Sequence, residues 1–214
     1  MIIDAAFVRS AASVADFPRD GVAEIALVGR SNVGKSSLIN ALVRRRIART
    51  SAAPGKTRLA NIYRVTRAGG RSWYLVDLPG YGYARGDTSA FDELTRAYFG
   101  QARQVGRVRR VGGINPPAPP GPPASPAHVS ALLLVDARHP GLESDINAWR
   151  WLQHMVARAD VVATKIDKLA RGERIRALRK FESVFERPVL PVSAATGEGL
   201  DDLWKLIAQQ LTSA

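Results

Sequence analysis

The stretch GRSNVGKSS, residues 29–37, decides the fold, because its first eight residues match the phosphate-binding pattern G-x-x-x-x-G-K-[ST]. The apolar run EIALVG at 24–29 precedes it and predicts a buried strand. Residues 35–45 follow with apolar side chains on one face, which predicts a helix. A glycine-rich turn between a strand and a helix points backbone N–H groups at phosphate oxygens. A plain turn with a solvated lysine is the alternative for the pattern taken alone.

We expect the whole stretch to surround phosphates: Gly29, Arg30, Ser31, Asn32, Val33, Gly34, Lys35, Ser36 and Ser37. Lys35 would place its charge on the outer phosphates, and the Ser36 hydroxyl would bind Mg²⁺. Asp77 ends a second apolar strand and begins DLPG, so its carboxylate is another candidate Mg²⁺ ligand. Gly80 lets its backbone N–H approach the terminal phosphate. Taken alone, Asp77 would only end a strand before a turn.

The sequence TKID at 164–167 predicts which base is bound. The Asp167 carboxylate can accept hydrogen bonds from N1–H and the 2-amino group of guanine together. Adenine offers neither donor and would leave the carboxylate unpaired, at a cost of several kcal/mol. The alkyl stem of Lys165 can cover the base, and the Ala194 N–H can donate to guanine O6. These features favour guanine over adenine nucleotides.

Elsewhere, short apolar runs alternate with helical periodicities, which predicts a mainly parallel sheet with helices on both faces. Strands are expected at 24–29, 61–66, 72–77, 129–136, 160–164 and 188–193. Helices are expected at 35–45, 89–104, 143–157, 171–184 and 200–211. Gly69-Gly70 indicates a hairpin turn. Seven of the 13 prolines fall in 112–127. We expect this segment to be a tolerated surface insertion, with a recognition segment as the alternative.

Composition limits the class of protein. The 214 residues are 46% hydrophobic and 23% charged, which suits one globular domain. The absence of cysteine excludes disulfides, thiolate metal sites and a cysteine nucleophile. The sequence contains no apolar run of about 18 residues, so we expect no transmembrane helix. The N-terminus lacks the features of a secretory signal. We therefore expect a cytoplasmic protein. The oligomeric state stays open at this point, and a monomer is favoured.

The net charge is +12, and the basic residues are clustered. No acid occurs from Ile25 to Val76, a span with many arginines, or from Leu94 to Val135. Clustering favours a face that binds polyanions, and an arginine-rich coding bias is the alternative. The candidates for contact with RNA are Arg44, Arg45, Arg46, Arg49 and Arg58.

Taken together, the motifs resemble the EngB (YihA/YsxC) family of ribosome-assembly GTPases, within the Era- and TrmE-like group. The matching stretches are GRSNVGKSSLINAL at 29–42, ARTSAAPGKTR at 48–58, DLPGYGYA at 77–84, LLVDARH at 133–139, TKIDKL at 164–169 and SAATGEGLDDL at 193–203. The resemblance implies a P-loop GTPase (G domain) over 1–214, with its core at about 22–212 and a six-stranded sheet containing one antiparallel strand. It also implies Mg²⁺, large-subunit precursor rRNA as partner, and a link to cell division and septation.

The resemblance also assigns roles to individual positions. It places the first switch at Pro54, Gly55 and Thr57, with Thr57 binding Mg²⁺. It places the second switch at Asp77, Leu78, Pro79, Gly80 and Tyr81. Around the base it places Thr164, Lys165, Asp167, Ser193, Ala194 and Ala195.

Tyr81 stands where many GTPases have a glutamine that orients the attacking water, so we expect slow hydrolysis that a partner accelerates. Asn32 is a candidate contact for K⁺; the alternative is that it only shapes the loop. His128, His139 and His154 show no metal-ligand spacing. Two other functions stay open: a GTPase of another RNA-related task, and an RNA-binding protein with a vestigial nucleotide site.

Overall fold

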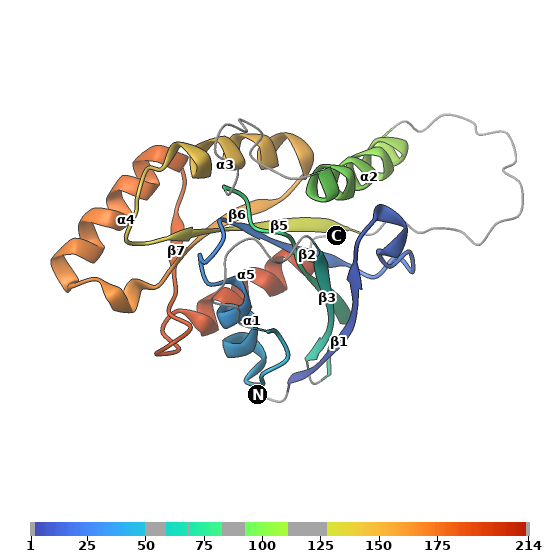
Figure 1. Cartoon of the computed structure of the whole chain (residues 1–214), viewed down its shortest axis with the longest axis horizontal. Coiled ribbons are helices and arrows are strands. Elements are labelled where there is room, and N and C mark those ends of the chain that lie inside the picture. Colours follow the sequence, from blue (N-terminus) through green and yellow to red (C-terminus); the bar gives the residue numbers. More distant parts are fainter. Residues whose placement is uncertain (1–2, 50–58, 68, 83–92, 111–127, 213–214) are drawn as a thin grey trace, which may run out of the picture.

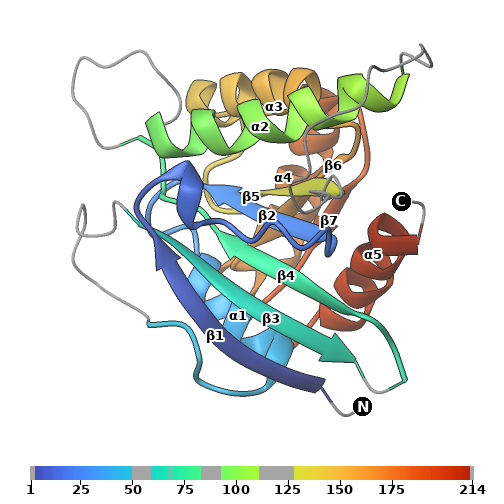
Figure 2. The ribbon, with the colours of Figure 1, turned by 90° about the vertical axis from the view of Figure 1, so that its right-hand side faces the viewer.

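Seven strands form one sheet in the part of the chain that the computed structural model describes, residues 3–49, 59–67, 69–82, 93–110 and 128–212. The side chains of 102–110 are not described. The strands are β1 (Ile3–Ala11), β2 (Glu24–Gly29), β3 (Ala60–Arg67), β4 (Ser72–Asp77), β5 (Val129–Asp136), β6 (Ala159–Thr164) and β7 (Val189–Pro191). Their order across the sheet is β1-β3-β4-β2-β5-β6-β7 (Figure 2).

One strand, β3, runs against the others among the described strands. It is antiparallel to both β1 and β4, whereas β2 is parallel to β4 and β5, and β6 is parallel to β5 and β7. The predicted α/β class with one antiparallel strand is therefore confirmed. The predicted number of six strands is wrong, because β1 adds a seventh at the edge beside β3. Its sequence IDAAFVRSA has a weak apolar alternation, since only Ala5 and Ala11 are buried.

Five helices cover the two faces of the sheet within the described residues: α1 (Lys35–Val43), α2 (Glu93–Arg110), α3 (Glu143–Met155), α4 (Arg171–Phe185) and α5 (Leu200–Thr212). Alternate residues of β2 point to opposite faces, as strand geometry requires. Leu27 belongs to the cluster that contains the buried residues of α1 and α5. Val28 belongs to the cluster with those of α2, α3 and α4. One core therefore lies on each face of the sheet. Figure 1 shows α2, α3 and α4 on one face and α1 and α5 on the other.

The topology brings the expected site residues together at the edge of the sheet where the parallel strands have their carboxyl ends. Strands β2, β4, β5 and β6 are parallel, so their carboxyl ends lie together. These strands end at Gly29, Asp77, Asp136 and Thr164. In doubly wound sheets ligands bind at this edge, where the loops leave the strands. Among the described helices, none combines the length and the apolar character needed to cross a bilayer.

Candidate functional site

The loop after β2 has a backbone that only glycine tolerates at its two ends. A Cβ on Gly29 would lie 2.8 Å from both the carbonyl oxygen of Leu134 and Cγ1 of Val33. Gly34 is the N-cap of α1 and has a φ of 111°, in the left-handed region that favours glycine. Asn32 shares this region with a φ of 61°. The loop therefore curls tightly at the N-terminus of α1, as an anion-binding turn requires.

Lys35, Ser36 and Asp77 meet beside this loop. The Nζ of Lys35 donates a hydrogen bond of 3.4 Å to the Gly29 carbonyl, and burial lowers the pKa of this amine although the charge of Asp77 opposes the shift. Burial raises the pKa of Asp77 to about 6, while the charge of Lys35 and a hydrogen bond from Ser36 lower it. Oδ1 of Asp77 is buried and has no hydrogen-bond partner among the described residues. An unpaired carboxylate oxygen beside a hydroxyl is an oxygen donor set that suits Mg²⁺.

The segment after β4 lies against the phosphate loop. The N–H of Ser31 donates to the Tyr81 carbonyl, and the N–H of Tyr81 donates to the Gly29 carbonyl, both at 3.3 Å. A Cβ on Gly80 would lie 2.8 Å from the Ser31 nitrogen and 2.9 Å from its Cα. Leu78 is buried, and its N–H donates to the Leu27 carbonyl. The segment 78–81 is therefore joined to the loop through its backbone.

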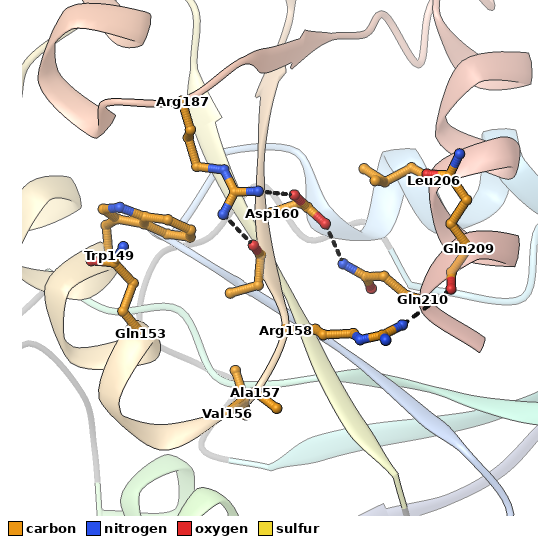
Figure 3. A pocket seen from close by; sticks show the side chains of 11 residues that line it. Trp149, Gln153, Val156, Ala157, Arg158, Asp160, Arg187, Leu206, Gln209 and Gln210 are labelled. Carbon is orange, nitrogen blue, oxygen red and sulfur yellow. Dashed lines mark hydrogen bonds and ion pairs between the residues drawn. The ribbon is translucent and has the colours of Figure 1, made fainter. Parts of the chain in front are cut away.

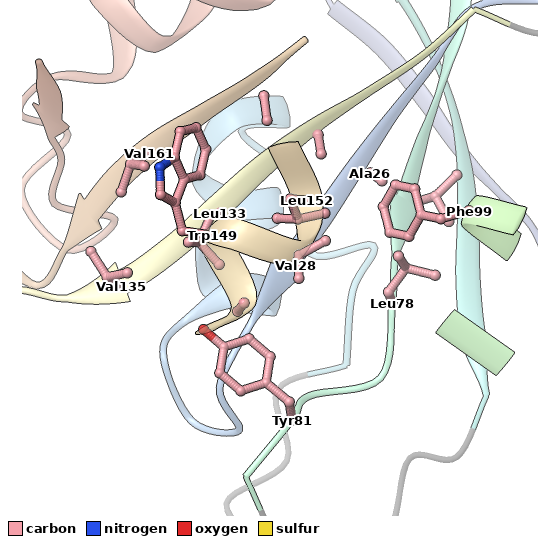
Figure 4. Packing of buried hydrophobic residues seen from close by; sticks show 14 of the residues in the cluster. Ala26, Val28, Leu78, Tyr81, Phe99, Leu133, Val135, Trp149, Leu152 and Val161 are labelled. Carbon is pink, nitrogen blue, oxygen red and sulfur yellow. The ribbon is translucent and has the colours of Figure 1, made fainter. Parts of the chain in front are cut away.

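The side chain of Tyr81 points away from the loop and into the core. Its ring belongs to the cluster that packs Leu78, Val28, Val135 and Trp149 together (Figure 4). Its hydroxyl donates a hydrogen bond of 2.8 Å to Oδ1 of Asp145 in the first turn of α3. Burial and the charge of Asp145 raise the pKa of this phenol, so it stays neutral. Tyr81 therefore does not present its hydroxyl to the phosphate loop.

Asp167 and Ser193 form the other half of the site. The Ser193 hydroxyl donates a hydrogen bond of 2.7 Å to Oδ1 of Asp167, and Lys168 lies 3.4 Å from Oδ2. The hydrogen bond from Ser193 is the main cause that lowers the pKa of Asp167, so the carboxylate is ionised at neutral pH. The Ser193 hydroxyl also accepts from the N–H groups of Ala195 (3.2 Å) and Thr196 (3.1 Å). Ser193 thus orients the carboxylate.

Lys165 and Thr164 join the two halves. Lys165 has a φ of 60°, and its Nζ donates to the Asn32 carbonyl and, at 3.0 Å, to Oδ2 of Asp136. Its Cε lies 3.8 Å from the position of a Cβ on Gly34, so the alkyl stem crosses the phosphate loop. The buried Thr164 hydroxyl donates to the Val33 carbonyl at 2.7 Å. The Thr164 hydroxyl therefore joins the end of β6 to the phosphate loop.

Sequence reasoning did not single out Asp136 and Asp145. Arg138 donates to both carboxylate oxygens of Asp136, at 2.9 and 2.7 Å, and with Lys165 it lowers the pKa of Asp136 against the effect of burial. Asp136 thereby fixes Lys165 over the loop. The signal was its place at the end of an apolar strand, within LLVDARH. Asp145 gave no local signal, because its partner is 64 residues away.

Some predicted residues lie outside the described part of the chain: Pro54, Gly55, Thr57 and Arg58. Ala194 is half-buried next to Ser193, and Ser37 is exposed in the first turn of α1. Arg44, Arg45 and Arg46 are exposed just beyond the C-terminal end of α1, so the helix separates them from the phosphate loop. Arg49 is also exposed. Among the described residues, no group of three His, Cys, Asp or Glu side chains suits a metal ion.

A polar cavity of about 450 Å³ lies elsewhere, between α3, α5 and the start of β6 (Figure 3). Asp160 in its wall accepts hydrogen bonds from Arg187 and from Gln210, and the Arg187 guanidinium lies 5.0 Å from the Trp149 ring centre. Because β6 begins here, the cavity is at the opposite end of the strand from Thr164. None of the expected nucleotide contacts lines it. We interpret the network as a structural link between β6, β7 and α5.

Comparisons with known proteins agree with this geometry. Residues 24–111 match the family model described as 50S ribosome-binding GTPase. A probable GTP-binding protein EngB of Heliobacterium modesticaldum is 39% identical over 211 residues, which cover 96% of this chain and 91% of that protein. The corresponding protein of Thermotoga maritima is 36% identical, with 99% and 98% covered.

Solved structures support the fold. The structure of a probable GTP-binding protein engB aligns with a TM-score of 0.56 and 21% identity, over 90% of this chain and all of that one (100%). Aquifex aeolicus Era bound to GDP and AlF4⁻ aligns with a TM-score of 0.66 and 21% identity, over 89% of this chain and 57% of that one.

Proposed function

Since the chain belongs to the EngB family of P-loop GTP-binding proteins, we propose that it is a nucleotide-dependent switch in assembly of the large ribosomal subunit. It binds GTP and GDP at the edge formed by residues 29–37, Asp77 and Asp167, and it hydrolyses GTP slowly. The observation that carries the proposal is the meeting of a phosphate loop and an oriented, ionised carboxylate at one edge of the sheet. Lys165 connects the two by crossing the loop.

Guanine selectivity rests on Asp167. Its carboxylate is ionised and held by Ser193, and this leaves acceptor capacity for the two donors on the guanine edge. The neighbouring Ala194 N–H would donate to O6. Adenine has an acceptor at N1, where guanine has a donor, and an amino donor at C6, where guanine has an acceptor. Both contacts therefore disfavour ATP.

Mg²⁺ would be held by Ser36 and Asp77, with Thr57 proposed as a further ligand. The support is the buried Oδ1 of Asp77 without a protein partner, beside the Ser36 hydroxyl. When bound, the ion neutralises charge on the phosphates. The protein's own part is to place Lys35 at the loop and to hold Asp77 at the end of β4.

Slow hydrolysis follows from Tyr81. Its hydroxyl is engaged with Asp145 in the core, so the side chain does not orient a water at the terminal phosphate. A partner, or K⁺ near the exposed Asn32, would supply the missing stabilisation. Comparing hydrolysis in K⁺ and Na⁺ buffers tests the role of K⁺: a faster rate in K⁺ is expected, and equal rates would exclude it.

The ribosomal partner is proposed from the family model described as 50S ribosome-binding GTPase and from the exposed arginines. Arg44, Arg45, Arg46 and Arg49 would contact phosphates of precursor rRNA together with Arg58. We further propose a cytoplasmic monomer with a single G domain, in which 112–127 is a surface insertion. A link to cell division and septation would follow from impaired ribosome assembly.

Co-sedimentation with large ribosomal subunits tests the proposal. Protein loaded with a non-hydrolysable GTP analogue should sediment with the subunits more than GDP-loaded protein, and added salt should weaken the binding. Replacing Arg44, Arg45 and Arg46 together by glutamine should reduce the bound fraction.

The matched control replaces three exposed arginines of α4, Arg171, Arg176 and Arg179, by glutamine. This variant has the same charge change but should bind like the wild type. Equal sedimentation of the GTP- and GDP-loaded forms would contradict a nucleotide-dependent role. Equal losses in the two triple variants would contradict the assignment of the RNA-binding face.

A further inference from the structure

We propose that Asp145 is a positioning residue that anchors Tyr81, and through it the backbone of Gly80, and thereby supports the binding of GTP more than that of GDP. This inference rests on the proposed function, because it assigns a partner to the switch segment of the same nucleotide site. Asp145 lies in α3, outside every motif that binds nucleotide in our account. Its effect would therefore reach the ligand through Tyr81.

The contact between Asp145 and Tyr81 is short and buried. The Tyr81 hydroxyl donates to Oδ1 of Asp145 at 2.8 Å, and the two residues are 4% and 1% exposed. A buried hydrogen bond to a carboxylate is stronger than one between neutral groups. Losing either partner would leave the other buried group without this hydrogen bond, at a cost in free energy. The pair therefore fixes where the Tyr81 side chain can lie.

Tyr81 is fixed at its backbone as well. Its N–H and carbonyl both bond to the phosphate loop, at Gly29 and Ser31, while its ring points from the loop toward α3 (Figure 4). The residue thus joins three parts of the site: the loop, the second switch segment and α3. Gly80 precedes it directly and is pressed against Ser31, where a Cβ would not fit. A shift of Tyr81 would move Gly80.

The charged groups around Asp145 come from several elements. Arg30 of the phosphate loop and His139 favour its ionised form, whereas Asp136 opposes it. Arg30 also passes near Gly82, since its Nε lies 3.7 Å from the position of a Cβ there. The same arginine thus acts electrostatically on Asp145 and lies close to the segment that follows Tyr81. This arrangement strengthens the link between loop and switch.

The anchor has a different effect on the two nucleotides. The Gly80 N–H is the group expected to reach the terminal phosphate, which GTP has and GDP lacks. Displacing Gly80 should therefore cost more affinity for GTP than for GDP, which lacks the phosphate that this N–H would contact. A pair that only stabilised the fold would lower the free energy of unfolding without changing the ratio of the two affinities. The ratio separates the two roles.

The experiment measures the Kd of the full chain for GDP and for a non-hydrolysable GTP analogue. Tyr81→Phe keeps the ring and removes only the hydroxyl, and Asp145→Ala removes the acceptor. Both variants should bind the analogue about tenfold more weakly, the scale of one lost charged hydrogen bond. Their affinity for GDP should stay within about twofold of the wild type. Asp145→Asn keeps an acceptor oxygen and should therefore retain most of the wild-type affinity for the analogue.

If Asp145→Ala does not fold, Tyr81→Phe and Asp145→Asn still decide the question. The proposal would be contradicted if folded Tyr81→Phe had an unchanged ratio of affinities for the analogue and GDP, or if it bound the analogue more tightly than the wild type. Failure of the wild type to bind either nucleotide would instead contradict the proposed function.

Discussion

The Ser193 hydroxyl donates a 2.7 Å hydrogen bond to the Asp167 carboxylate, although 26 residues separate them in sequence. Ser193 itself is fully buried and is held by two backbone N–H groups that donate to its oxygen. The carboxylate is thus oriented before any ligand arrives. Preorganised acceptors bind their partners at a lower entropic cost. Ser193 acts on the base through Asp167.

Replacing Ser193 by alanine tests this relationship. The change removes the donor to Asp167 and leaves two N–H groups without an acceptor, so affinity for GTP should fall by about tenfold. The measurement is the Kd for a labelled GTP analogue. Thr212→Ala is the control, since its exposed hydroxyl donates to the Ala208 carbonyl within α5, away from the site, and its loss should leave the Kd unchanged. An unaltered affinity in Ser193→Ala would show that orientation is unimportant.

Gly29 is predicted to be intolerant of a side chain. A Cβ there would lie 2.8 Å from the backbone oxygen of Leu134, in a neighbouring strand that cannot easily move. Gly29→Ala should therefore lower the free energy of unfolding by about 1–3 kcal/mol, measured by denaturant titration. Gly100→Ala in α2 is the matched control, because a Cβ there meets no atom within 4 Å. It should raise stability by about 0.5–1 kcal/mol. Equal effects of the two changes would refute the packing argument.

Glu24 should make stability depend on pH. Burial raises its pKa from 4.5 to about 7, although the hydrogen bond from Tyr98 opposes the shift. The folded state then binds the proton more tightly than the unfolded state, so this stability is complete below pH 4.5 and is lost as pH rises to 7. The loss is about 3 kcal/mol. Glu24→Gln should abolish this pH dependence because the amide does not titrate, while its oxygen can still accept the hydrogen bond from Tyr98.

The check is thermal or denaturant unfolding of both proteins across that range. The difference between Glu24→Gln and the wild type should grow in favour of the variant as pH rises, and then level off. Asp77 and Asp145 also have raised pKa values, so the stability of both proteins should decline with rising pH for this further reason. This shared decline cancels when the stability of the wild type is subtracted from that of the variant. A constant difference would mean that Glu24 does not titrate as the structure predicts.

Local patterns predicted the centre of the fold well. The strands at 24–29, 72–77 and 129–136 have the observed bounds, because turn residues or prolines flank each apolar run. The helix predicted at 35–45 ends at Val43, since Arg44 has a φ of 53° and cannot continue it. The helix predicted at 89–104 is observed as Glu93–Arg110, within the described residues. Its polar last turns gave no clear stop signal.

Long-range contacts were beyond the reach of pattern reasoning. β1 exists because it pairs with β3, some 50 residues later, and its small alanines give little periodicity. The pairs Tyr81–Asp145 and Lys165–Asp136 join segments whose proximity is set by the sheet order. The motifs predicted which residues gather at the edge. The residues that orient them, Asp136 and Asp145, could be identified only from the three-dimensional structure.

The replacement of Asp167 by asparagine tests the guanine-binding claim most directly. The side chain keeps its shape, but one acceptor becomes a donor, which suits the 2-carbonyl of xanthine instead of the 2-amino group of guanine. Competition with labelled nucleotides should show at least about a hundredfold loss of GTP affinity and a gain for XTP. Unchanged GTP affinity with no gain for XTP would contradict the account, because the base would then be read elsewhere.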